Sequence, residues 1–307
     1  MRILVVGAGS TGGYFGACLA RHGRDVTFLV REKRAAALKK HGLVIHAKTG
    51  SFTLSPQLLQ AGDITGPFDL ILLTVKSFGL DQAIRDITPA VGEQTLILPI
   101  LNGMRHINTL SEAFGKDKVL GGLCKIHSTL NEQGEILQMS ALHELVYGEQ
   151  DGSDSTRIRQ LDAVLSDCGF NNRLSMTIRN DMWEKWLLLS TLGAVTCLAR
   201  GNTRQVVCSA GGVVLLQAIY SEVLAVITAS GYQQRPATIA STLQMLSNPE
   251  TPLTSSMYRD LVQGYPVEAD QIIGDLVDRA NAHAVPVPLL NAVYVNLQVY
   301  QQTQNAG

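Results

Sequence analysis

The side chain best suited to chemistry in this sequence is a lysine at the start of an apolar segment. Residues 180–200 read NDMWEKWLLLSTLGAVTCLAR, with Lys185 between Trp183 and Trp186. The length and apolar character of this run predict a long buried helix. A lysine ammonium, whose ordinary pKa is about 10.4, is protonated at neutral pH. Lys185 could therefore donate a proton to a carbonyl oxygen on which negative charge develops.

A plain surface ion pair is the competing interpretation of Lys185. Asp181 lies four residues earlier, and an exposed pair of this spacing contributes roughly 0.3–0.5 kcal/mol to helix stability. Leu189, Leu192 and Gly193 share the helix face of the lysine, so the ammonium would overlook apolar surface. We expect Gly193, which has no side chain, to leave room there for another group.

A second group of candidate residues lies in the glycine-rich segment GAGSTG near the start of the chain. It comprises Gly7, Ala8, Gly9, Ser10, Thr11 and Gly12. The segment follows a predicted strand and opens a predicted helix, which is the context in which GxGxxG binds a dinucleotide. Gly7 would make the tight turn, Gly9 would let the backbone approach a pyrophosphate, and Gly12 would pack the helix against the strand. A glycine-rich turn without a ligand is the alternative.

The residues after the second predicted strand indicate which dinucleotide would bind. The sequence FLVREKR puts Arg31 where NAD enzymes usually carry an acidic residue, with Lys33 and Arg34 behind it. Cations at this place suit the 2′-phosphate of NADP, so we expect NADP(H) rather than NAD(H). Glu32 keeps NAD open, because a shift of one residue would put its carboxylate in the ribose pocket.

Two polar residues end the next two predicted strands. Lys76 follows the apolar run in residues 69–77, and Asn102 ends the run in residues 94–104. Ligands of open α/β sheets lie beyond the carboxyl ends of the strands, so both side chains could reach a bound cofactor. A solvated lysine and a turn-forming Asn-Gly pair are the alternatives.

The order of elements predicts two domains. Buried strands alternate with helices through the first part of the chain, which indicates a parallel sheet covered on both faces. Residues 119–147 resemble antiparallel strands added to the sheet edge, with turns at NEQG and near Ser140. Helical patterns follow, including 209–230, 236–247, 255–263 and 266–284. We expect a dinucleotide-binding domain over residues 1–175 and a helical domain over 176–307.

Composition narrows the class of protein. The 307 residues are 46% hydrophobic with a formal net charge of −1, so charge gives no reason to expect nucleic acid or a membrane as partner. Five scattered cysteines form no metal-binding spacing and suit a reducing compartment. The first residues do not resemble a signal peptide. We expect a cytoplasmic protein without a metal site.

Five segments together resemble one enzyme family. GAGSTGG, LLTVKS, ILPILNGM, MWEKWLLLS and SSMYRDLVQGYPVEAD resemble, in order and spacing, the motifs of ketopantoate reductase (2-dehydropantoate 2-reductase). The resemblance implies an α/β fold: an N-terminal Rossmann-type doubly wound sheet, followed by an all-helical domain like the C-terminal domain of 6-phosphogluconate dehydrogenase. It also implies NADPH-dependent reduction of ketopantoate to pantoate, a step of pantothenate biosynthesis.

The resemblance implies a role for each site residue. Lys185 matches the general acid that protonates the carbonyl oxygen, and Glu268 matches a glutamate that positions substrate and cofactor. Asn102 and Ser256 match residues that hold the substrate carboxylate or its surroundings. Lys76 and Arg31 match positions that contact the cofactor, as do Asn102 and Glu268.

Two positions depart from the family pattern. Ketopantoate reductases usually carry asparagines four and eight residues after the lysine, where this chain has Leu189 and Gly193. Ser190 or Thr191 could replace part of that polarity, and a third family asparagine would fall near Thr203 or Asn202. An apolar wall discriminates weakly between substrates, so a less polar 2-ketoacid is as well supported as ketopantoate. An NADP-binding sensor without turnover is a further alternative. The small-molecule substrate is the expected partner, and a homodimer is left open.

Overall fold

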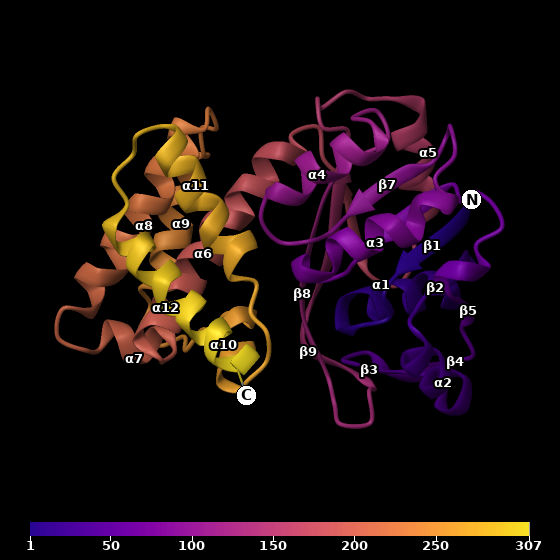
Figure 1. Ribbon diagram of the computed structural model, residues 1–307, viewed down its shortest axis with the longest axis horizontal. Coiled ribbons are helices and arrows are strands. Elements are labelled where there is room, and N and C mark those ends of the chain that lie inside the picture. The colour runs from indigo at the N-terminus through magenta and orange to yellow at the C-terminus, as the bar shows by residue number, and fades with distance from the viewer. Residues whose placement is uncertain (307) are drawn as a thin grey trace. The chain divides into compact units, whose positions relative to one another are not determined.

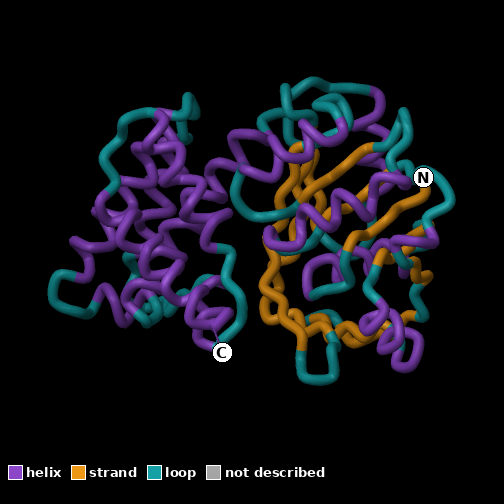
Figure 2. The backbone as a smooth tube through the Cα atoms, viewed as in Figure 1, coloured by secondary structure: helices purple, strands orange, loops and turns teal. Residues whose placement is uncertain are grey.

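The computed structural model describes residues 1–306, and the chain divides into two compact units. The first unit contains residues 1–101 and 106–179, and the second contains residues 102–105 and those from 180 onward. The described strands all belong to the first unit, whereas the described part of the second unit is helical (Figures 1 and 2).

A five-stranded parallel sheet forms the centre of the first unit. The strand order is β5-β2-β1-β6-β7. Starting from β1, the chain adds strands first toward one edge of the sheet and then toward the other, as in doubly wound sheets. The bounds are β1 Arg2–Val6, β2 Asp25–Leu29, β5 Gln57–Leu59, β6 Leu70–Leu73 and β7 Leu96–Pro99. The helices of this part of the chain are α1 Ser10–Arg21, α2 Glu32–His41, α3 Leu80–Ile87, α4 Arg105–Phe114 and α5 Thr156–Leu165. In register, Val6 lies beside both Leu29 and Leu73, so three strands end together.

A second sheet, β10-β9-β3-β4 with β8 paired to β9, corrects the expectation of strands added to the first sheet. Its strands are β3 Leu43–Ala47, β4 Gly50–Leu54, β8 Gly121–Leu130, β9 Ile136–Gly148 and β10 Asn171–Leu174. Val119 alone joins the edge at Ile97 before the chain turns into the new sheet. The turn expected near Ser140 is wrong, because β9 runs unbroken and a shift in register between Ile126 and Ser128 absorbs the irregularity.

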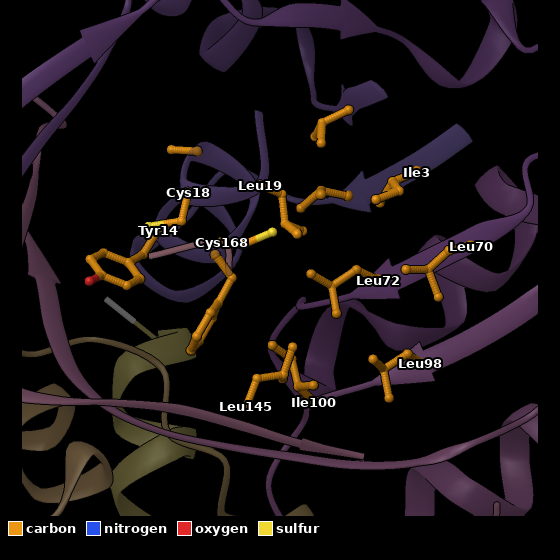
Figure 3. Packing of buried hydrophobic residues seen from close by; sticks show 14 of the residues in the cluster. Ile3, Tyr14, Cys18, Leu19, Leu70, Leu72, Leu98, Ile100, Leu145 and Cys168 are labelled. Carbon is orange, nitrogen blue, oxygen red and sulfur yellow. The ribbon is translucent and has the colours of Figure 1, made fainter. Parts of the chain in front are cut away.

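The core of the first unit lies between the two sheets and helices α1 and α5. Figure 3 shows Ile3, Leu70 and Leu72 of the parallel sheet together with Leu145 of β9 and Leu19 of α1. These side chains are almost completely buried, and each fully buried residue of this size stabilises the fold by roughly 1.5–3 kcal/mol. The second sheet is therefore part of the same core.

The second unit is a helical bundle built around α6 and α8. Its helices are α6 Ile178–Ala199, α7 Thr203–Val207, α8 Gly212–Ala229, α9 Pro236–Leu246, α10 Ser256–Val262, α11 Asp275–Ala282 and α12 Pro288–Ala306. Helix α8 is, by length and composition alone, apolar enough to cross a membrane. It packs here against α7, α9, α11 and α12, and its Glu222 accepts hydrogen bonds from the amides of Leu289 and Leu290. Seven of its 18 residues are buried.

Candidate active-site residues in each unit

The glycine-rich turn has the geometry that a dinucleotide-binding turn requires. Gly7 has a φ of 97°, which favours glycine, and its amide donates to the carbonyl of Leu29 at 3.0 Å. A Cβ at Gly9 would meet nothing within 4 Å, so the backbone is open there. A Cβ at Gly12 would overlap the hydroxyl of Thr74 and lie 2.5 Å from the carbonyl oxygen of Gly7. The turn therefore fits the pyrophosphate of a dinucleotide at the start of α1.

Alanine at Gly12 is expected to harm the protein more than alanine at Gly9. The Gly12→Ala methyl has no room beside Thr74, and such overpacking costs about 1–3 kcal/mol. The Gly9→Ala methyl points into open space, so it should leave the thermal midpoint of unfolding almost unchanged. Calorimetry of both variants measures this difference, and equal midpoints would contradict the packing argument.

The cations after β2 divide into two groups. Arg31 precedes α2 as its N-cap residue, and Arg31 and Lys33 are exposed. Glu32 is the first residue of α2, where a carboxylate is stabilised by the helix dipole. Arg34 is turned away from this exposed group: its Nε donates to the carbonyl of Ala8 at 3.1 Å and its Nη1 to that of Gly134 at 2.9 Å. Arg34 is therefore not part of an exposed basic group with Arg31.

Lys76 lies where the sequence predicts, three residues beyond the end of β6. It precedes the 3₁₀ turn Ser77–Gly79, and its Nζ lies 5.9 Å from the centre of the Phe78 ring. The backbone before it is fixed by Thr74, whose hydroxyl donates to the carbonyl of Val6 at 2.8 Å. Lys76, Arg31 and the glycine-rich turn thus follow the carboxyl ends of three neighbouring strands.

In the second unit, the tryptophans beside Lys185 fix the start of α6. The Nε1 of Trp186 donates to the carbonyl of Ile272 at 3.1 Å, and both rings are 1% exposed. The Trp183 ring stacks on that of Tyr232 at 4.5 Å, and the Arg279 guanidinium lies over Trp183 at 5.1 Å. The two tryptophans are packing residues, and they hold Lys185 on a rigid helix.

Glu268 and Asn102 lie close to the segment that accepts the hydrogen bond from Trp186. A π-helical turn, Asp270–Gly274, begins two residues after Glu268 and contains Ile272. Gln271 of this turn donates through its Nε2 to the carbonyl of Asn102 at 2.9 Å. Single π turns occur frequently at functional sites. The structure thus connects the segments of Lys185, Glu268 and Asn102 through one buried turn.

The charged neighbours of this turn come from residues that the sequence did not single out. Arg105 lies 2.5 Å from Asp278 and 3.8 Å from Asp275, and Arg279 lies 3.2 Å from Asp275. Burial raises the pKa of Asp275, and the two guanidinium groups oppose that shift. This cluster fixes the short Asn102–Arg105 segment on α11. This charged cluster could not be predicted from a sequence pattern, because Arg105 is far from α11 along the chain.

The Asp181 carboxylate, which the sequence offers as an ion-pair partner for Lys185, also lies beside Arg235. Nη2 of Arg235 lies 2.5 Å from Asp181 and also contacts Glu184, and both carboxylates are at least nine-tenths buried. Arg235 further donates through its amide to Glu184 at 3.1 Å. These contacts join the beginning of α9 to the first turns of α6, and this role of Arg235 was missed.

Ser256 is exposed at the first position of α10, while its neighbour Ser255 is buried and caps that helix. The Ser255 hydroxyl lies 3.1 Å from that of Thr196, which joins α10 to α6. Among the described residues, no group of three or more His, Cys, Asp or Glu side chains is arranged to hold a metal ion.

The space beside Gly193 is filled, which corrects the expectation that it leaves room for another group. A Cβ at Gly193 would lie 2.8 Å from the terminal methyl of Met257, a residue of α10 that is 2% exposed. Ser190 gives its hydroxyl to the carbonyl of Trp186 at 2.6 Å, and Asn202 caps α7. Both side chains therefore bond to the backbone of a helix.

Comparison with known proteins decides the family. Residues 3–152 match the family model described as "Ketopantoate reductase PanE/ApbA". Residues 177–301 match the model described as "Ketopantoate reductase PanE/ApbA C terminal". The chain belongs to the ketopantoate reductase family. It is 38% identical over 301 residues to an uncharacterised oxidoreductase, YkpB, of Bacillus subtilis, covering 98% of this chain and 99% of the relative. It is accordingly an oxidoreductase of that family.

Solved structures share the fold over nearly the whole chain. The 2-dehydropantoate 2-reductase of Geobacter metallireducens superposes with a TM-score of 0.87 at 27% identity, covering 97% of this chain and 99% of that one. A D-mandelate dehydrogenase, solved with NADH and anilino(oxo)acetate, gives 0.88 at 20% identity over 99% of this chain and all of its own. The predicted fold class, a Rossmann-type sheet followed by a helical domain, is confirmed.

Proposed function

We propose that this protein reduces a 2-ketoacid with NADPH, with Lys185 as the general acid. The observation that carries the proposal is that Trp186 and Ile272 fix the lysine helix to the turn after Glu268. A catalytic ammonium must be held in place, and buried neighbours with a hydrogen-bonded backbone do so. A lysine required only for solubility would need no such support.

The roles of the chain's own residues follow from their chemistry. The nicotinamide supplies the hydride. Lys185 supplies a proton to the carbonyl oxygen, and its positive charge stabilises the negative charge that develops there. Glu268 orients substrate and cofactor, while Ser256 and Asn102 offer hydroxyl and amide donors to the substrate carboxylate. The division into residues 1–175 for the cofactor and 176–307 for catalysis belongs to this proposal.

Arg31 supports NADPH as the cofactor. It is exposed beyond the end of β2 and is the N-cap residue of α2, while Glu32 is the first residue of that helix. A free guanidinium can bind a phosphate through two parallel hydrogen bonds. The D-mandelate dehydrogenase of the same fold was solved with NADH, so NADH is the alternative cofactor to be compared with NADPH.

The wall beside Lys185 supports a substrate with an apolar side chain. Leu189 stands where the family usually has its first asparagine, and Met257 fills the place of the second beside Gly193. The D-mandelate dehydrogenase was solved with anilino(oxo)acetate, which carries an anilino group, and with it an aromatic ring, on its oxo carbon. Ketopantoate, and with it a place in pantothenate biosynthesis, is the second candidate. We further propose a cytoplasmic location, with a homodimer left to measurement.

The filled space at Gly193 gives a specific prediction. Gly193→Asn alone should lower the thermal midpoint of unfolding, because the new side chain collides with Met257. Adding Met257→Ala should restore the midpoint and improve the kcat/KM ratio of ketopantoate over an apolar 2-ketoacid, since the double variant regains an amide. Calorimetry and rates with both substrates measure this, with Met257→Ala alone as the control. An unchanged ratio would contradict the specificity argument.

The proposed function is tested by following loss of NADPH absorbance with ketopantoate and a panel of 2-ketoacids with alkyl and aryl side chains. Faster turnover of an apolar 2-ketoacid supports the proposal in full. Selective turnover of ketopantoate would keep the reaction and overturn the apolar substrate. NADPH binding without oxidation across the panel would overturn the reductase and favour a sensor.

A further inference from the structure

Arg34 makes two contacts that the proposed function does not explain. This arginine belongs to α2 and is partly buried, with Nε 3.1 Å from the carbonyl oxygen of Ala8 and Nη1 2.9 Å from that of Gly134. Ala8 lies inside the glycine-rich turn, between the glycine that makes the bend and the glycine that stays open. Gly134 lies at the tip of the hairpin formed by β8 and β9. One guanidinium thus joins two segments that are 126 residues apart in the chain.

The tip of the β8–β9 hairpin is held in place by side-chain hydrogen bonds. Asn131 accepts a hydrogen bond from the amide of Glu135 at 2.8 Å, and its own side-chain amide donates to the Glu135 carboxylate at 2.8 Å. His46 of β3 contacts the same carboxylate at 3.0 Å. The hydrogen bond from Asn131 and the contact with His46 lower the pKa of Glu135. The carbonyl of Gly134 is therefore presented from a closed and anchored turn.

Two further contacts join the hairpin to the same end of α1. The Ser128 hydroxyl donates to the carbonyl of Ser10 at 3.2 Å, and Ile136 packs so tightly on Gly13 that a Cβ there would overlap its methyl. Figure 1 shows β8 and β9 as the longest strands of this unit. The hairpin therefore meets the glycine-rich turn and the start of α1 from one side, with Arg34 as the charged link.

The charge of Arg34 has no counter-ion in this part of the protein. Among the described residues, no carboxylate forms an ion pair with Arg34, and its Nη2 is buried without a hydrogen-bond partner. Burial lowers the pKa of the guanidinium from its ordinary value. A partly buried cation without a counter-ion is unfavourable, so a structural link alone would be served better by a neutral side chain. A positive charge beside a turn suited to pyrophosphate does have a use, because the ligand is an anion.

We propose that Arg34 is a positioning residue for the dinucleotide, which links the glycine-rich turn to the β8–β9 hairpin and holds the turn ready for the pyrophosphate. The inference rests on the proposed function, since it assumes that a nicotinamide dinucleotide binds this turn. Arg34 acts through Ala8, so it should matter equally for NADPH and NADH. This distinguishes it from Arg31, which is proposed to read the 2′-phosphate.

The test compares matched variants of the full-length protein. Arg34→Met removes the guanidinium and keeps most of the stem, and we expect its Kd to rise roughly tenfold for both NADPH and NADH. Arg24→Met is the control, because Arg24 also donates to two backbone carbonyls, those of Val164 and Ser166, away from the turn. Arg34→Lys keeps the charge without the fork and should not restore affinity. Restoration by lysine, or equal Kd values for Arg34→Met and Arg24→Met, would overturn the proposal.

A second pair of variants reaches the same link from the hairpin. A Cβ at Gly134, whose φ is 78°, would lie 2.7 Å from Nη1 of Arg34, so Gly134→Ala should displace the guanidinium and raise both Kd values. Gly23→Ala introduces alanine at the same φ, 77°, where a Cβ would meet nothing within 4 Å. Gly23→Ala should keep the wild-type affinity. Equal affinities in the two variants would contradict the link.

Hydrogen exchange separates failure of this inference from failure of the proposed function. In the protein without cofactor, amides of residues 7–13 should exchange roughly tenfold faster in Arg34→Met than in wild type or Arg24→Met. Unchanged exchange would overturn the link whether or not NADPH binds. Faster exchange in a protein whose wild type binds no nicotinamide dinucleotide would support the link and overturn the proposed function.

Discussion

Replacing Lys185 by alanine is expected to lower kcat by roughly 10²–10⁴-fold while leaving the Kd of NADPH unchanged. The loss is large because the ammonium supplies both the proton and the charge that stabilises the developing alkoxide. The cofactor should bind normally, because the glycine-rich turn and Arg31 belong to other segments. Steady-state rates with the best 2-ketoacid, together with NADPH fluorescence titration, measure the two quantities separately.

The control for this substitution is Lys116→Ala, which removes an exposed lysine between α4 and β8. It should keep both kcat and the Kd of NADPH. Lys185 lies between two buried tryptophans in the sequence, so Trp emission reports on the helix around it. The emission spectrum of Lys185→Ala should match that of wild type, which would show that the helix is intact. Wild-type turnover in a folded Lys185→Ala protein would remove Lys185 from the mechanism.

Replacing Arg31 by alanine is expected to raise the Kd of NADPH by about 10- to 100-fold and to change that of NADH by less than about threefold. The guanidinium can form a bidentate pair with an anion only at a 2′-phosphate, because NADH carries a neutral hydroxyl there. The measurement is a titration of each variant with both cofactors at one ionic strength, since phosphate contacts weaken with salt.

Lys39→Ala is the matched control for Arg31, because it removes a cation from the last turn of the same helix. Its affinities should stay within about twofold of wild type for both cofactors, as for a screened surface charge. Equal losses for NADPH and NADH in Arg31→Ala would show that Arg31 does not read the 2′-phosphate. In that case NADH would become the better supported cofactor.

The parallel sheet, apart from β5, could be predicted from sequence because its other four strands are short apolar runs between helical patterns. The predicted helices around 209–230, 236–247 and 255–263 match α8, α9 and α10 within a few residues. The second sheet could not be predicted, since β3 and β4 are short and gain their stability from pairing with the distant β9. Helices α4 and α12 were not predicted either, although α12 runs from Pro288 to Ala306.

The part of the candidate site that is formed by a local sequence motif could be predicted. The part that depends on contacts between distant segments could not. Gly7, Gly9 and Gly12 show their different geometries in the order the sequence suggests. Roles of Lys185, Glu268, Asn102 and Ser256 stay predictions from a resemblance. The filling of the Gly193 space by Met257 and the link through Arg34 are long-range contacts, and a single sequence does not display such contacts.

The buried indoles beside Lys185 have a consequence for spectroscopy. They are the only two tryptophans in the sequence, and both belong to the helical unit, whereas the first unit has tyrosines such as Tyr14 and Tyr147. Emission excited at the red edge of protein absorption therefore reports on the helical unit alone. Loss of that signal in denaturant can be compared with far-ultraviolet dichroism, which averages both units. Different midpoints would show that the two units unfold independently, without any label added to the protein.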